Sequence, residues 1–180
     1  LYSAVLGAPA ASYTYTVTAA DVANYTHLRF VMRVISSFAS STDDLLNVRF
    51  NGVSTGNAYN WVRMNFKNGP AGTGDLASGA NVNQIQLGDT YAVGGTTAWP
   101  RAPATFDVIV PLFAGTTYNK MVSGTSSRMT WYGEPAFPGQ WTTGTVAGIW
   151  NSTAVITSVT FFMTSGSINT GSAIAVYGMR

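Results

Sequence analysis

The chain has 180 residues, of which 46% are hydrophobic and 9% are charged, and its formal net charge is +2. This hydrophobic content excludes a disordered chain, and the few scattered basic residues form no patch of the kind that nucleic-acid binding requires. No apolar run approaches the roughly 18 residues of a membrane span, and the absence of cysteine excludes disulfides and thiolate metal sites.

The length favours a single domain over residues 1–180, and the low charge restricts how its surface is used. An average soluble domain has about 25% charged residues, so this chain must stay in solution through Ser, Thr, Asn and Gly. Because interface cores are depleted in charge, the composition favours an assembly subunit, with a solitary extracellular domain as the alternative. The first residues, LYSAVLGAPA, lack an initiator Met and a basic segment, so no signal peptide is expected.

Almost the whole chain has the pattern of short β-strands separated by turn signals. Apolar and polar residues alternate with a period of two, and Val, Ile, Thr, Tyr and Phe are frequent. One short helical turn is expected at 19–23. In chain order, the predicted strands are 12–17, 27–38, 45–52, 58–69, 82–89, 105–115, 119–133 (one long strand or a bent pair), 144–150, 154–163 and 172–179. About ten short strands without a fixed repeat predict an all-β fold, an antiparallel jelly-roll-like β-sandwich.

Two long segments interrupt this pattern. Residues 70–80 (PAGTGDLASGA) are rich in Gly, Ala and Ser and are expected to form an exposed loop. Residues 90–104 are expected to form a second loop, because Pro100 and Pro103 disfavour a central strand. Since loops often carry binding on a rigid sandwich, both segments are candidate contact segments.

Several predicted strands carry information about their faces. In 27–38 two arginines, Arg29 and Arg33, share one face, which is expected to meet water or a partner. The strand at 58–69 divides into two faces, one with Tyr59, Trp61, Arg63 and Asn65, the other with Asn60, Val62, Met64 and Phe66.

The last two predicted strands, 154–163 and 172–179, are expected to pair as a hairpin that closes the chain. Apolar residues occupy both faces of 154–163, including Ile156 and Phe162. A strand that faces water on one side does not show this pattern. We therefore expect cover on both sides, from the second sheet and from a loop or a neighbouring subunit.

Residues typical of catalytic sites are scarce. His27 is the only histidine and Glu134 the only glutamate, so Ser-His-Asp and paired-carboxylate chemistry both lack partners. We expect His27 to be a structural hydrogen-bonding residue. Asp43 and Asp44 are adjacent and could bind calcium, but a turn before a strand is favoured. The sequence predicts a protein that is not an enzyme and that has no cofactor and no metal.

Aromatic side chains are the candidates for a ligand site, because sugars stack on the faces of Trp and Tyr. The candidates in or beside the predicted loops, for a carbohydrate or a partner, are Trp99, Trp131, Tyr132 and Trp141. Trp61 and Trp150 lie within strand patterns and are expected in the core. The favoured interpretation is that the tryptophans fill the sandwich or an interface, and a sugar site is the alternative.

The closing segment, GIWNSTAVITSVTFFMTSGSINTGSAIAVYGMR, resembles the closing motif of a group of tailed-bacteriophage virion proteins. The matching elements are Trp150, Ile156-Thr157-Ser158, Gly171-Ser172 and Tyr177-Gly178. The stretches YTHLRFVMRVISS (25–37) and LLNVRFNGVSTGNAYNW (45–61) are similar to other parts of the group, and the opening VLGAPAASYTYT also fits. Residues 70–104 have no match.

This resemblance implies a jelly-roll-like sandwich with a non-enzymatic structural role in the virion. The first hypothesis is a capsid decoration (cement) protein that binds the major capsid protein or other virion proteins as a homo-oligomer, with a trimer favoured. The second hypothesis is a host-recognition module of a tail or head fibre that binds a host surface glycan. Both place the protein in the virion, on the capsid surface or on the tail, with no nucleic acid or membrane as partner.

Overall fold

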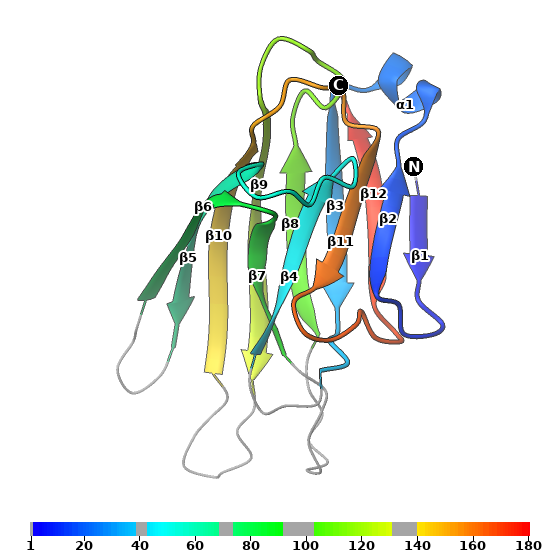
Figure 1. Ribbon diagram of the computed structural model, residues 1–180. Coiled ribbons are helices and arrows are strands. Elements are labelled where there is room, and N and C mark those ends of the chain that lie inside the picture. Colours follow the sequence, from blue (N-terminus) through cyan, green and yellow to red (C-terminus); the bar gives the residue numbers. More distant parts are fainter. Residues whose placement is uncertain (1, 39–42, 69–73, 92–102, 131–139) are drawn as a thin grey trace.

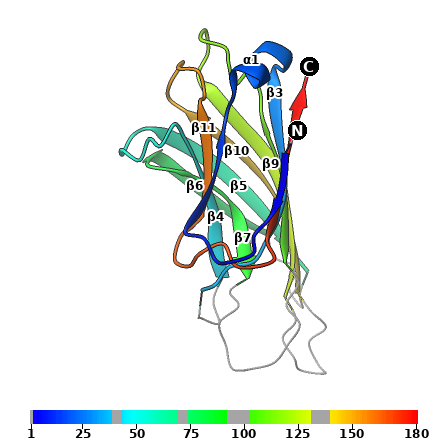
Figure 2. The same ribbon diagram turned by 90° about the vertical axis from the view of Figure 1, so that its right-hand side faces the viewer.

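Two antiparallel β-sheets pack face to face in the computed structural model of the protein (Figure 1). The structure describes residues 2–38, 43–68, 74–91, 103–130 and 140–180. Figure 2 shows the sandwich from the side of β1. The predicted antiparallel β-sandwich is confirmed, whereas its jelly-roll topology stays a prediction. The helix of the described residues is too short to span a membrane.

The larger sheet has eight strands in the order β1–β12–β3–β8–β9–β10–β5–β6. Their bounds, in that order, are Tyr2–Val5, Ala173–Met179, His27–Val34, Ala104–Val110, Lys120–Thr130, Gln140–Trp150, Tyr59–Lys67 and Gly74–Val82. All neighbouring pairs are antiparallel. The short β1 and the longer β6 form the two edges of this sheet.

The smaller sheet has four strands in the order β2–β11–β4–β7. Their bounds are Ser12–Thr16, Ser158–Met163, Asp43–Phe50 and Ile85–Tyr91. The predicted helical turn is confirmed as α1, Ala19–Asn24. It begins with a capping box between Thr18 and Asp21, and the Tyr15 hydroxyl donates to the Asp21 carboxylate at 2.9 Å.

The core lies between the sheets and is built from alternate residues of each strand. β3 shows the rule, because its burial alternates strictly and the exposed side carries Arg29 and Arg33, as predicted. Phe30 of the larger sheet meets Phe161 of the smaller sheet at 5.0 Å between ring centroids. Trp61 and Trp150 are buried, as the strand patterns predicted.

The expected closing hairpin is wrong, because β11 and β12 belong to different sheets. β11 pairs with β2 and β4, whereas β12 pairs with β1 and β3. The segment between them crosses the sandwich, and Asp44 holds it by accepting the backbone N–H groups of Ser165 and Gly166, each at 3.0 Å. Ile168 then exchanges two 2.8 Å backbone hydrogen bonds with Ala10. Hydrogen bonds to residues far away in the sequence direct this crossing. The alternation of apolar and polar residues carries no information about such bonds.

The apolar residues on both faces of 154–163 have separate explanations. Ile156 precedes β11, is fully buried, and donates its backbone N–H to the Phe113 carbonyl at 2.9 Å. Phe162 points away from the core and is covered by the Arg49 guanidinium, which lies 4.3 Å from its ring centroid. The cover predicted for this outer face is therefore supplied at Phe162 by β4 of the same chain.

The first predicted loop is wrong over residues 74–80, which form most of β6. Gly, Ala and Ser have low strand propensity, but the long β5 offers a ladder that overrides it. The second predicted loop is wrong at both ends, since Thr90 and Tyr91 end β7 and Ala104 begins β8. Its central part, 92–102, lies outside the described residues. The short β1 was not predicted at all.

Candidate interaction surface

Hydroxyl side chains cover the middle of the outer face of the eight-stranded sheet. They point outward from β8, β9 and β10 and are Thr105, Ser123, Thr125, Ser127, Thr143 and Thr145. The hydroxyls of Thr105 and Ser127 lie 2.8 Å apart, and that of Thr143 donates to the Ser126 carbonyl at 3.3 Å. Such short, uncharged side chains let another surface approach the sheet closely.

The charged groups on this face already have partners within the chain. Arg29 and Asp107 form a two-pronged ion pair, with Nε donating to Oδ1 at 2.8 Å. The hydrogen bond from Arg29 lowers the pKa of Asp107. Arg33 donates to the Gly171 carbonyl at 2.7 Å. Arg29 is therefore paired with a carboxylate, whereas the Arg33 guanidinium keeps its charge and is positioned by a neutral carbonyl.

An apolar strip lies toward the β6 side of this face. We define it as Val62, Met64 and Phe66 of β5, Leu76 of β6 and Trp141 of β10. Leu76 is 74% exposed, Trp141 60% and Phe66 51%. Leu76 opposes Met64 across the strands, and Phe66 opposes Thr143. Contiguous exposed apolar side chains of this kind are typical of an interaction site.

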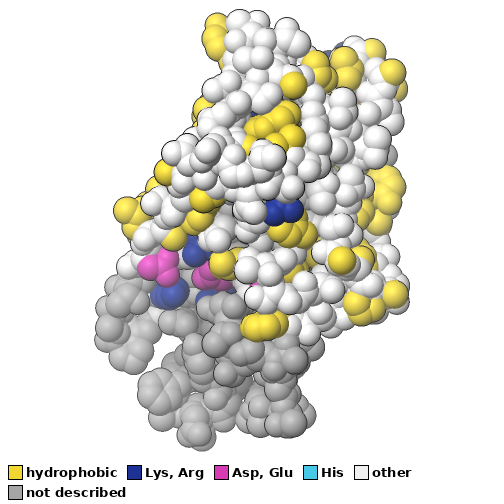
Figure 3. Space-filling model, viewed as in Figure 1, with side chains coloured by type: hydrophobic (Ala, Val, Ile, Leu, Met, Phe, Trp, Pro, Cys, Tyr) yellow, Lys and Arg dark blue, Asp and Glu magenta, His cyan; other side chains and the backbone are white. Residues whose placement is uncertain are grey.

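The polarity of β5 is inverted, because its charged side chains point into the sandwich. Arg63 contacts Asp89 of β7 at 3.0 Å, and Arg128 of β9 contacts the same carboxylate at 3.5 Å. All three are buried, and Asn65 lies beside them with its amide 3.5 Å from Asp89. In the view of Figure 3, basic and acidic side chains lie close together at the lower left. The buried Arg63–Asp89–Arg128 cluster fixes the register that turns Val62, Met64 and Phe66 outward.

Trp141 stands at the start of β10, where two hydrogen bonds to Asn68 hold its backbone. The Asn68 N–H donates to the Trp141 carbonyl at 3.0 Å, and the Asn68 side-chain oxygen accepts the Trp141 N–H. Trp141, Phe66 and Asn68 line an open cavity of about 460 Å³ with Lys67, Ser127, Thr142 and Thr143. The arrangement offers two aromatic surfaces, an amide and several hydroxyls, a set suited to a sugar ring or to an apolar partner surface.

Of the four aromatic candidates from the sequence, Trp141 is the one that the structure describes. Trp99, Trp131 and Tyr132 lie outside the described residues. Thr130 pairs with Gln140, so the described residues on either side of 131–139 lie next to each other and close to Trp141. The role of Trp99, Trp131 and Tyr132 in a carbohydrate or partner contact stays a prediction.

A small-residue hollow lies on the same face, between the apolar strip and β9. Its volume is about 370 Å³, and Val62, Met121 and Ile149 border it. The small residues that line it are Ser78, Gly79, Ala80, Ala147 and Gly148. A Cβ atom on Gly79 would lie 2.4 Å from the Trp61 indole nitrogen, so glycine is required there.

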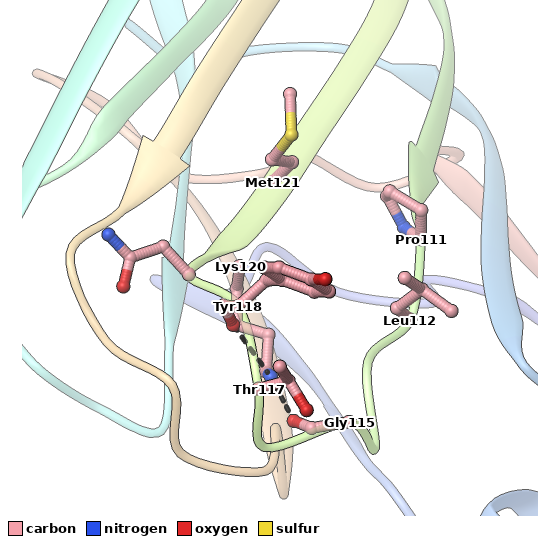
Figure 4. Close-up of a pocket in the computed structure, with 8 residues that line it drawn as sticks. Pro111, Leu112, Gly115, Thr117, Tyr118, Lys120 and Met121 are labelled. Atoms are coloured by element: carbon pink, nitrogen blue, oxygen red, sulfur yellow. Dashed lines mark hydrogen bonds between the residues drawn. The ribbon is translucent and has the colours of Figure 1, made fainter.

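A further cavity of about 380 Å³ lies beyond Met121, among Pro111, Leu112 and Tyr118 (Figure 4). Lys120 at its base is buried, and its ammonium donates to the carbonyls of Gly115, Tyr118 at 3.4 Å and Thr153 at 3.3 Å. Burial lowers the pKa of Lys120. Because three carbonyls engage the ammonium, it ties the loop to the sheet and is not directed at a ligand.

The residues considered for catalysis or metal binding have structural roles where they are described. His27 Nδ1 accepts the backbone N–H of Leu112 at 3.1 Å. The Asp44 carboxylate also accepts the Ser36 hydroxyl at 2.6 Å, in addition to the two backbone bonds given above. Among residues with described side chains, no three His, Cys, Asp or Glu are grouped so that they could hold a metal. Glu134 lies outside the described residues.

The sequence reasoning missed the apolar strip, which the structure assembles from three strands. The signal was present in 58–69, where Val62, Met64 and Phe66 share one face. Arg63 and Asn65 on the other face made the choice of buried side ambiguous, and the partner Asp89 lies on a different strand.

Comparisons with known proteins give no strong relative. No family model matches the sequence, and no curated protein matches it either. The carbohydrate recognition domain of Emp47p is 11% identical over 99% of this chain and 78% of that chain, with a TM-score of 0.27. A chain from the structure of infectious bursal disease virus Gx strain is 14% identical over 97% of this chain and 40% of its own, with a TM-score of 0.14. Likenesses this weak carry no argument about fold or function.

Proposed function

We propose that the protein is a non-enzymatic structural subunit of a bacteriophage virion that docks on a protein shell through the outer face of its eight-stranded sheet. The observation that carries the docking is the apolar strip, with Phe66 51% and Leu76 74% exposed. The sequence resemblance to tailed-phage virion proteins supports the setting. Within that setting, a capsid decoration protein that clamps the major capsid protein is the favoured role.

The chemistry of the outer face supports protein docking. Interface cores are rich in Met and aromatic residues and poor in charge, and the strip combines Met64, Phe66 and Trp141 beside uncharged hydroxyls. Burying the exposed half of Met64 or Phe66 contributes on the order of 1 kcal/mol each. Contacts of this size become effective when many copies bind one lattice. A protein that binds only the assembled shell stabilises it by mass action.

The experiment is a co-sedimentation assay with tailed-phage capsids that lack this protein. We expect the purified protein to sediment with the capsids, and Phe66→Asp to weaken the binding by at least about tenfold because a carboxylate is placed in an apolar contact. Val5→Asp is the matched control, since Val5 is 68% exposed on the opposite edge of the same sheet. Failure of the wild type to bind, or equal effects of both variants, contradicts the proposal.

The Trp141 cavity favours a second candidate function, glycan binding at the surface of a tail or head fibre. Sugar sites combine an aromatic face with hydrogen-bonding groups that fix orientation. Here Trp141 and Phe66 supply the faces, and Asn68, Ser127 and Thr143 supply the polar groups. Lys67 is held by Asp75 at 2.9 Å, so the site favours a neutral sugar over an anionic one.

A glycan array with bacterial surface sugars tests this candidate. Trp141→Ala is expected to abolish binding, whereas Tyr118→Ala is the control. Tyr118 is an exposed aromatic residue that precedes β9 and lines a different cavity. Absence of any bound glycan with the wild type, or loss of binding in both variants, rejects a sugar site at Trp141.

A further inference from the structure

The edge of the eight-stranded sheet at β6 has few of the features that keep edge strands from pairing. Natural edges are protected by Lys, Pro, bulges or short length. β6 spans nine residues without Lys or Pro, and its one charged residue, Asp75, is bound by Lys67. A bulge is present only at its far end, between residues 79 and 82. Residues 74–79 therefore offer a regular ladder to another strand.

At this edge a projecting leucine side chain lies beside the small-residue hollow. Leu76 projects from the outer face and is the most exposed large hydrophobic side chain in the described residues. Two residues further along the same face, Ser78 belongs to the rim of the small-residue hollow. The hollow holds about 370 Å³, enough for part of a leucine side chain, and its lining is almost entirely apolar.

A second copy of the chain fits this edge in an antiparallel arrangement. A two-fold axis perpendicular to the sheet pairs β6 with its copy and keeps both outer faces on the same side. Every register centred on one residue of β6 places outward side chains opposite one another, and Asp75, Leu76 and Ala77 define three of them. Centring on Asp75 would oppose two carboxylates, which is unfavourable. Centring on Leu76 would oppose two leucines and leave both hollows empty.

The remaining register, centred on Ala77, places Leu76 of each copy opposite Ser78 of the other. Each Leu76 then reaches the rim of the other copy's small-residue hollow, so the projecting and recessed features match twice. We propose that the protein forms a two-fold dimer through β6 in this register, which joins the two larger sheets into one continuous sheet. This pairing differs from the trimer that the sequence resemblance favours, and it does not depend on the role in a virion.

Sedimentation velocity of the protein alone, from about 1 µM to about 1 mM, tests the association. Because a single edge contact is a small interface, we expect a concentration-dependent monomer–dimer equilibrium. Leu76→Asp should weaken it by at least about tenfold, since it places two carboxylates at the contact. Val5→Asp, which adds the same charge at the other edge, should leave it unchanged. A monomeric wild type at all concentrations, or a dimer that Leu76→Asp does not weaken, overturns the proposal.

Disulfide cross-linking tests the register, because the chain has no cysteine of its own. On the two-fold axis the Ala77 side chains of the two copies lie directly opposite each other, at a spacing that a disulfide can bridge. Ala77→Cys should therefore give a covalent dimer on mild oxidation much faster than Val5→Cys. Equal rates for the two variants overturn the register. The assay contains no capsid or glycan, so its outcome is independent of the docking and glycan tests.

Discussion

Substitution of the buried Asp89 tests directly whether the charged cluster inside the sandwich stabilises the fold. Arg63 and Arg128 both contact it, at 3.0 Å and 3.5 Å, and all three side chains are at most 9% exposed. Asp89→Asn keeps the size and removes the charge. Breaking a buried ion pair by removing one partner costs about 3–5 kcal/mol, because the opposite charge stays buried. We expect the free energy of unfolding to fall by this amount.

The matched control is Asp107→Asn, which removes the same group from the ion pair with Arg29. That pair is exposed, with side chains 44% and 37% accessible, and solvent screening makes the contribution of an exposed pair small. Urea unfolding of both variants measures the difference. For a chain of this length, each kcal/mol also lowers the melting temperature by about 2–4 °C. If Asp89→Asn costs no more than Asp107→Asn, the Arg63–Asp89–Arg128 cluster does not stabilise the fold as argued.

Two further predictions concern pH and packing. Burial raises the pKa of Tyr59, and burial together with the hydrogen bond to Asp21 raises that of Tyr15 to about 12. In the unfolded chain the tyrosines ionise at their ordinary pKa of 10.0. The stability that the raised pKa values contribute is therefore complete below pH 10 and is lost as the pH rises toward 12. Chemical unfolding at a series of alkaline pH values should show this fall and a shallower one in Tyr15→Phe; an unchanged slope would contradict it. Gly79→Ala should destabilise the fold by about 1–3 kcal/mol, because the new methyl group overlaps the Trp61 indole, whereas Gly56→Ala, where nothing lies within 4 Å, should cost much less in the same denaturation assay.

The sequence predicted the all-β sandwich because alternation is a local signal. β3 and β8 were predicted from their first residues, within one position, because each carries an unbroken apolar face, but the predicted strands 27–38 and 105–115 extend past Val34 and Val110. β6 could not be found this way, because Gly, Ala and Ser form a strand there only through pairing with β5. The hairpin predicted for the closing strands was wrong for a similar reason. The hydrogen bonds that direct β11 and β12 into different sheets run to Asp44 and Ala10, which are far away in the sequence.

The candidate surface was partly predictable. Trp141 was selected from the sequence because it falls between the predicted strands 119–133 and 144–150, where a loop was expected. The structure places it in β10 instead, exposed on the surface beside Phe66. The rest of the apolar strip depended on which face of β5 is buried. That choice is made by Asp89, which is more than twenty residues away and on the other sheet, so no local pattern contains it.

The position of β12 affects the order in which the molecule is completed. β12 lies between β1 and β3 in the larger sheet, so this strand, which is synthesised after all the other described strands, fills a place between two of the first. Until β12 is present, β1 has no neighbour within the described sheet. Phe30 of β3 then also lacks Val176, the residue opposite it on β12. Such distant pairings make folding slow, because a long loop must close before any contact rewards it. During synthesis β1 and β3 therefore stay unjoined until β12 has been made, and a copy interrupted before Ala173 would expose the side of β3 that β12 normally occupies.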